Sequence, residues 1–212
     1  MVTCQMIFVG YIKCGLHKIM SSENTCSDVP LLGDNLALDF INTECLVEGK
    51  SHDYFIDDQS VASWLIRVGL MTDLNDKQIP HGLLNEAREL RETARNVVNA
   101  AMTRVPVNLA VINRILEVGR PIRKLEWDDD MQKFRVTVCQ TAGYPFNLWP
   151  IADALINLVT SDKFEYVRQC EAHDCILLFH DLSKSHRRRW CSMATCGNRM
   201  KVAAFRSRKK TL

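Results

Sequence analysis

Two pairs of cysteines near the C-terminal end constrain the fold more than any other feature of the chain. Each pair has four residues between its members, and fifteen residues separate the pairs, which are Cys170, Cys175, Cys191 and Cys196. Zinc binds four thiolates in a tetrahedron, and two short knuckles joined by a loop supply them at this kind of spacing. Four sulfur ligands leave no open coordination position, so such an ion has a structural role. The pattern predicts a small module held together by one Zn²⁺ ion.

The other five of the nine cysteines show no regular spacing. The chain is too long and too poor in cysteine for a disulfide framework, so we interpret these five as free thiols in a reducing compartment and expect a cytoplasmic protein. Three histidines near the pairs are alternative metal ligands, although four thiolates already complete the shell: His173, His180 and His186.

Positive charge is concentrated at the same end of the chain. The net charge is only +2, yet the last 31 residues, 182–212, contain ten Lys and Arg and no Asp or Glu. Surfaces that bind polyanions concentrate positive charge in this way. The alternative interpretation is that these residues form a solvated basic tail without a partner. We expect a nucleic acid as partner, and the sequence does not distinguish duplex DNA from structured RNA. The candidate contacts are Lys184, Arg187, Arg188, Arg189, Arg199, Lys201, Arg206 and Arg208.

Residues 1–30 are predicted to form a leader outside the folded part, with Met20 as an alternative translation start. The apolar run Met6–Ile12 is too short to cross a bilayer. Lysines follow this run, whereas a secretory signal places its basic residues first. We therefore expect no membrane segment.

Residues 31–160 are predicted to form one α+β domain. Apolar residues at helical spacing predict helices over residues 57–69, 80–102 and 106–119, and a further helix that begins after Pro150 and ends at Val159. Alternating apolar residues on both sides of Asp128–Asp130 predict a β-hairpin over residues 122–139. Residues 35–43 fit either a buried strand or a short helix, because their periodicity does not decide between them.

A polar cluster, Asp39, Asn42 and Thr43, lies among apolar residues in this domain. One interpretation is a pocket that senses a small-molecule effector, and the other is local capping and turn hydrogen bonds. The sequence contains no nucleophile–base arrangement, glycine-rich phosphate loop or histidine-based zinc site. We therefore do not expect an enzyme. The alternative is a domain that acts on a small molecule, with the zinc module serving only to localise it.

Residues 161–212 are predicted to form a treble-clef-like zinc finger with a basic C-terminal helix. The expected order is strand, knuckle, strand, turn and then a helix that starts at the second cysteine pair. Helical spacing predicts cations on two sides of this helix, with Arg199, Arg206 and Lys210 on one and Lys201 and Arg208 on another, together with an inward face. The inward face comprises Met200, Ala203, Ala204 and Ser207.

The second knuckle, RWCSMATCGNR over residues 189–199, resembles the CGNR zinc-finger family. Lys201 and the preceding Phe179, Asp181 and Ser183 are part of the same resemblance. The segment Gly33–Thr43 is similar to the start of the ABATE domain, which precedes the finger in these bacterial proteins. The family is regarded as stress-induced transcription regulators. The resemblance covers roughly residues 31–210 and implies zinc on the four cysteines, a treble-clef-like finger and DNA binding. The first knuckle departs from the family pattern, because Glu171–Asp174 replaces a turn that usually contains Asn-Pro.

Overall fold

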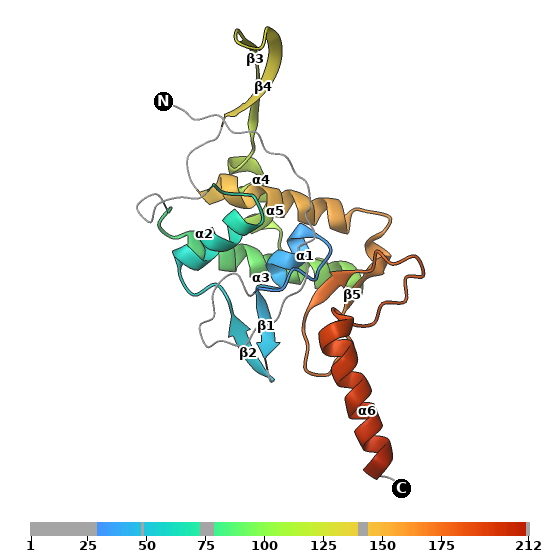
Figure 1. Cartoon of the computed structure of the whole chain (residues 1–212). Helices are drawn as coiled ribbons and strands as arrows, with labels where there is room; N and C mark the ends of the chain where they lie inside the picture. Colours follow the sequence, from blue (N-terminus) through green and yellow to red (C-terminus); the bar gives the residue numbers. More distant parts are fainter. Residues whose placement is uncertain (1–28, 48, 73–78, 140–143, 211–212) are drawn as a thin grey trace.

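The computed structural model describes residues 29–47, 49–72, 79–139 and 144–210 (Figure 1). Its sheets are three antiparallel strand pairs, β1–β2, β3–β4 and β5–β6. This mixture of helices and small sheets confirms the predicted α+β class. The helices and strands in chain order are α1 (Leu36–Ile41), β1 (Glu44–Val47), β2 (Lys50–Asp53), α2 (Asp58–Arg67), α3 (Leu83–Thr103), α4 (Ala110–Val118), β3 (Ile122–Asp128), β4 (Lys133–Cys139), α5 (Tyr144–Val159), β5 (Val167–Gln169), β6 (Leu178–His180) and α6 (Asn198–Lys210).

The short helix α1 lies at the centre of the N-terminal region. It packs against α3, α5 and β6, and Leu38, Phe40 and Ile41 are fully buried. Asn35 caps its N-terminus, because the side-chain oxygen accepts a hydrogen bond from the Ala37 amide at 2.9 Å. The structure thus resolves residues 35–43 in favour of a helix. A helix with neighbours on several sides has no wide polar face, which explains its ambiguous pattern.

The predicted helices over residues 57–69, 80–102 and 106–119 are confirmed as α2, α3 and α4, although α4 begins at Ala110 and leaves Pro106 outside the helix. Asp57 starts α2 through a capping box, in which its carboxylate accepts from the Ser60 amide at 2.7 Å and the Ser60 hydroxyl accepts from the Asp57 amide at 3.1 Å. Helix α3 buries one stripe of apolar residues, including Leu90 and Ala94, against α1 and α2. Gly119 is the C-cap of α4, as expected.

The start of α5 differs from the prediction. The helix begins at Tyr144, and Pro150 lies inside it, although proline was expected at its start. An interior proline removes one backbone hydrogen bond and costs a helix stability. The upstream turns of α5 bury Phe146 and Leu148, which offsets that cost.

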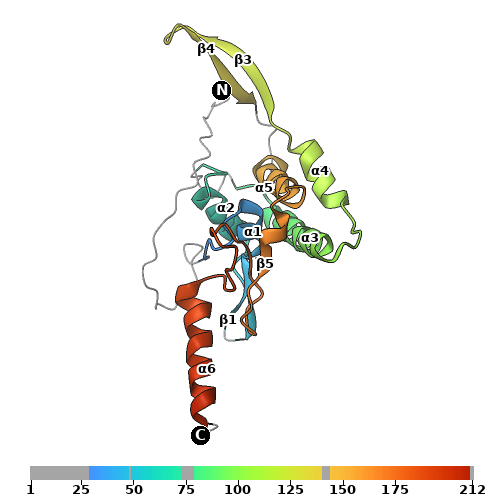
Figure 2. The same cartoon turned by 90° about the vertical axis from the view of Figure 1, so that its right-hand side faces the viewer.

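The two ends of the molecule carry its two projecting elements. The hairpin β3–β4, predicted from alternation, stands away from one end, and α6 extends from the other (Figures 1 and 2). Between them, Val167 and Leu178 of the C-terminal module belong to the same apolar core as helices α1 to α5. The C-terminal module therefore packs against the N-terminal region through its strand pair β5–β6. None of the helices in the described part of the chain has the length and apolarity needed to cross a membrane.

Candidate metal centre and basic surface

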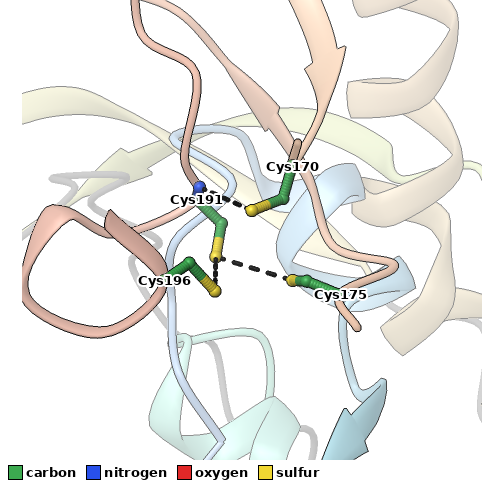
Figure 3. A group of neighbouring side chains, drawn as sticks. All are labelled: Cys170, Cys175, Cys191 and Cys196. Carbon is green, nitrogen blue, oxygen red and sulfur yellow. Dashed lines mark hydrogen bonds between the residues drawn. The ribbon is translucent and has the colours of Figure 1, made fainter. Parts of the chain in front are cut away.

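The four predicted ligands converge at the junction of β5, β6 and α6. Cys170 and Cys175 bracket the turn between the two strands, and Cys191 and Cys196 lie on the second knuckle (Figure 3). The four sulfur atoms all lie within 4.8 Å of one another. The Sγ–Sγ distance is 3.8 Å between Cys175 and Cys191, and 3.6 Å between Cys191 and Cys196. A zinc ion with Zn–S bonds of about 2.3 Å sets tetrahedral sulfur atoms about 3.8 Å apart. The spacing therefore fits zinc.

The electrostatics of the cluster also favour a bound cation. The hydrogen bond with the Cys191 thiol lowers the pKa of Cys175 to about 5, whereas that contact and burial raise the pKa of Cys191. Burial raises the pKa of Cys196 to about 11. The Cys175 thiolate is thus favoured, whereas Cys191 and Cys196 are held as thiols. A divalent ion reverses this preference, because its charge stabilises every coordinated thiolate.

Hydrogen bonds within the module orient the second knuckle. The Cys191 amide donates to the Cys170 sulfur at 3.4 Å, and Arg199 donates to the Cys196 sulfur at 3.4 Å. Ser192 caps the single turn Met193–Gly197, because its hydroxyl accepts from the Thr195 amide at 3.3 Å. Donors of this kind hold sulfur ligands in place and reduce their charge. With four buried sulfurs and no water position, the cation would connect the first knuckle to the base of α6.

Arg188 is a structural residue, which its place in the basic run did not indicate. Its guanidinium donates to the carbonyls of Leu32 and Trp190, both at 3.0 Å, and forms an ion pair with Asp34. It also lies over the Phe179 ring at 4.3 Å. Because these partners belong to both parts of the chain, Arg188 fastens the finger to the segment that leads into α1. We therefore do not expect Arg188 to contact nucleic acid.

Two further candidate cations have partners within the finger. Arg199 forms an ion pair with Asp174 at 2.7 Å, and this contact links α6 to the first knuckle. Arg189 contacts Glu171 at 2.6 Å and lies over the Trp190 ring at 4.9 Å, although its side chain is mostly exposed. Both contacts involve residues of the knuckle that departs from the family pattern, so acidic side chains there neutralise part of the basic surface.

The remaining candidates lie on the surface. Helix α6 is exposed from position 201 to position 209, which corrects the expected inward face, because Ala203, Ala204 and Ser207 meet solvent. Met200 alone of that set packs against the apolar cluster around the cysteines. Beside the base of α6 lies a surface hollow of about 310 Å³ lined by Arg187, Arg188, Arg189, Trp190 and Met193. The exposed candidates without one of the contacts described above are Lys184, Arg187, Lys201, Arg206 and Arg208.

The polar cluster of the N-terminal region is buried and bonded to protein groups. The Asp39 carboxylate accepts from the Gly33 amide at 2.7 Å, and the Thr43 hydroxyl donates to the Phe40 carbonyl at 2.7 Å. Asn42 reaches across to the finger, where its side chain donates to the Leu178 carbonyl at 2.8 Å and accepts from the Leu178 amide at 2.9 Å. The contacts of Asp39 and Thr43 are local, as expected if the cluster serves for capping and turn hydrogen bonds. The contact of Asn42 joins the two parts of the chain, and no short-range pattern could have indicated it.

Asp181, which was noted only within the family pattern, organises the loop before the second knuckle. It is fully buried, and its carboxylate accepts from the Ser183 amide at 3.0 Å, the Ser183 hydroxyl at 2.6 Å and the Arg188 amide at 2.8 Å. Burial alone would raise the pKa of Asp181, but these donors hold it below its ordinary value. Asp181 is the last acidic residue before the long acid-free stretch, and this position could have indicated its structural role.

Comparisons with known proteins agree with this geometry. Residues 166–209, which contain the four cysteines and α6, match the CGNR zinc finger. Residues 34–162 match the ABATE family, which is described as "putative stress-induced transcription regulator". A search of curated proteins finds no match. Since the second match alone covers more than half of the chain, the protein belongs to the ABATE family and carries a C-terminal CGNR zinc finger.

Proposed function

We propose that this chain is a DNA-binding transcription regulator that docks α6 on its target. The observation that supports this most is the setting of α6. The helix extends clear of the body, contains six Lys and Arg and no acid among its thirteen residues, and is held at its base by the four-cysteine centre (Figure 2). A cationic helix with one fixed end is suited to a nucleic-acid groove.

The order of side chains around α6 favours a groove over a flat surface. At 100° per residue, Lys201 and Arg208 form one basic row, and Arg199 and Arg206 form another on nearly the opposite side of the helix. Between the two rows lie the exposed side chains of Val202 and Phe205, with Lys209 over the Phe205 ring at 5.4 Å. In a major groove, such rows would meet the phosphates of both strands. The apolar side chains between them would then face the base edges, where thymine presents a methyl group.

The hollow beside α6 supplies a second contact region. Arg187 and Arg189 line it together with the Trp190 ring. Guanidinium groups beside an aromatic surface hold phosphate through paired N–H donors and accept a stacked base or sugar. Because the hollow and the helix share the second knuckle, both would approach the same stretch of nucleic acid.

In this proposal, a bound zinc ion holds α6 and the hollow beside it in a fixed arrangement. The described part of the finger contains two strands of three residues each, two single helical turns and the helix α6, too little to form a stable core without help. Binding of the ion supplies folding energy to such a module. Removal of the metal should therefore abolish DNA binding, while α1 to α5, which supply most of the shared apolar core, stay folded.

We also propose that the N-terminal region passes a signal to the finger. Its most direct routes are the Asn42–Leu178 pair and the Arg188–Asp34 ion pair. A ligand that moves α1 would alter both contacts at once. Asp39, Asn42 and Thr43 would then act as the connection between effector and finger.

The test begins with selection of bound fragments from random duplex DNA, with an RNA pool selected in parallel. Binding of the recovered sequence is then measured against salt for the Lys201→Ala/Arg208→Ala variant. Two lost phosphate contacts should lower the slope of log K against log salt by about 2. A matched control removes two exposed cations elsewhere, in Lys50→Ala/Arg120→Ala, and should leave the slope unchanged. An unchanged slope in the α6 variant, or tighter binding by the RNA pool, would overturn the proposal.

A further inference from the structure

The hairpin β3–β4, here called the arm (residues 122–139), has two chemically different faces. Its strands pair in register, with Trp127 opposite Phe134 and Glu126 opposite Arg135. Side chains of paired residues lie on the same face, and faces alternate along each strand. One face is therefore polar, with Lys124, Glu126, Asp128, Lys133 and Arg135. The other is apolar apart from Arg123 and carries Leu125, Trp127, Phe134 and Val136.

The apolar face has no cover in the described part of the molecule. Exposure is 67% for Leu125, 46% for Trp127, 67% for Phe134 and 50% for Val136. These fractions leave roughly 450 Å² of apolar surface in water, the size of patch that marks an interaction site. A lone two-stranded hairpin is only marginally stable, so an arm that projects from the body gains most from a partner on this face (Figure 2).

The charges of the arm indicate which partner fits. Residues 122–139 contain four Lys and Arg and four Asp and Glu. The acids gather at the tip, in Asp128–Asp130, whereas Arg123 and Lys124 lie at the root next to Arg120. A neutral arm with an acidic tip is a poor ligand for nucleic acid or an anionic membrane. Two arms laid antiparallel, however, place the acidic tip of each beside the basic root of the other.

We propose that the apolar faces of two arms pack against each other, antiparallel, in a homodimer of this chain. The contact is isologous, because the same residues meet on both copies. It would bury roughly 900 Å² of apolar surface in total, close to the lower limit for a specific interface, and the root and tip contacts add to this. The dimer is therefore a reversible one that depends on protein concentration.

Sedimentation equilibrium of the full chain tests the proposal. Replacing the apolar pair in Trp127→Ser/Phe134→Ser should raise the dimer dissociation constant by at least about 30-fold, as expected for aromatic residues at the centre of an interface. The matched control, Glu126→Ser/Arg135→Ser, changes the neighbouring pair on the polar face with no change in net charge, and should shift the constant by less than about threefold. Equal effects of the two variants would overturn the proposal, as would a wild-type chain that stays monomeric at about 100 μM.

A charge-swap experiment tests the antiparallel orientation and does not depend on the stability of the arm. A tip variant, Asp129→Lys/Asp130→Lys, and a root variant, Arg123→Glu/Lys124→Glu, should each self-associate poorly because like charges meet. When the two are mixed, the altered tip of one meets the altered root of the other, and association should return. A mixture that remains monomeric while the wild type dimerises would overturn the antiparallel arrangement.

Discussion

Loss of the Asn42 side chain should loosen the finger from the N-terminal region. The Asn42 amide is fully buried and forms two hydrogen bonds with the backbone of Leu178, at 2.8 Å and 2.9 Å. The substitution Asn42→Ala leaves the amide and the carbonyl of Leu178 buried with no partner from this side. Each unsatisfied backbone group costs about 1–3 kcal/mol, so the combined loss is roughly 2–6 kcal/mol.

Hydrogen exchange of the Leu178 amide measures this loss directly, since that amide donates one of the two bonds. At 1.4 kcal/mol for each factor of ten, the expected loss makes exchange about 30 to 20,000 times faster in the zinc-loaded protein. Asn157→Ala is the matched control, because the hydrogen bond from the Asn157 side chain to Asp153 is exposed, and it should leave the Leu178 rate nearly unchanged. Exchange less than tenfold faster in Asn42→Ala would refute the reasoning.

Three further outcomes are expected. Cys191→Ser should lose zinc from the purified reduced protein by elemental analysis, whereas Cys45→Ser, which alters a buried cysteine of the same apolar cluster but not a predicted ligand, should keep one equivalent. Arg188→Ala should lower the melting temperature by several degrees through loss of its buried contacts, whereas Arg187→Ala should weaken DNA binding and leave the melting temperature unchanged. Burial alone would raise the pKa of Asp53, but hydrogen bonds from the Arg91 guanidinium hold it below its ordinary value. The carboxylate therefore stabilises the fold above about pH 4 and this contribution disappears on acidification, so Asp53→Asn should lower the melting temperature at pH 7 and flatten its fall with decreasing pH.

The features that could be predicted from the sequence are those that depend on neighbouring residues. The spacing of Cys170 and Cys175, and of Cys191 and Cys196, predicts metal-binding knuckles, because each pair closes a short turn around one ion. Asp57 indicates a helix start because its capping partner lies three residues away. The alternation around Phe134 predicts a strand pair, although it does not show that the apolar face would be uncovered.

The features that escaped prediction depend on residues far apart in the chain. Helix α1 was ambiguous because strand β6, about 140 positions later, covers part of it. Arg188 was grouped with Arg187 and Arg189 as a cation, and its contacts with the distant Leu32 and Asp34 give it a different role. Pro150 was placed at a helix start, because the apolar contacts that continue α5 upstream of it are tertiary ones. Sequence patterns predict whether a segment forms a helix or a strand, whereas the contacts of individual side chains can be read only from the folded structure.

The placement of the arm and α6 at opposite ends has a consequence for how DNA would be engaged (Figure 1). In many dimeric regulators, the two reading helices lie side by side, one helical turn of duplex apart. Here, copies joined tip to root through their arms would direct their reading helices outward, away from the shared axis. Such a pair is suited to bridging two separate segments of duplex, and its binding would then depend on DNA looping and on the distance between sites.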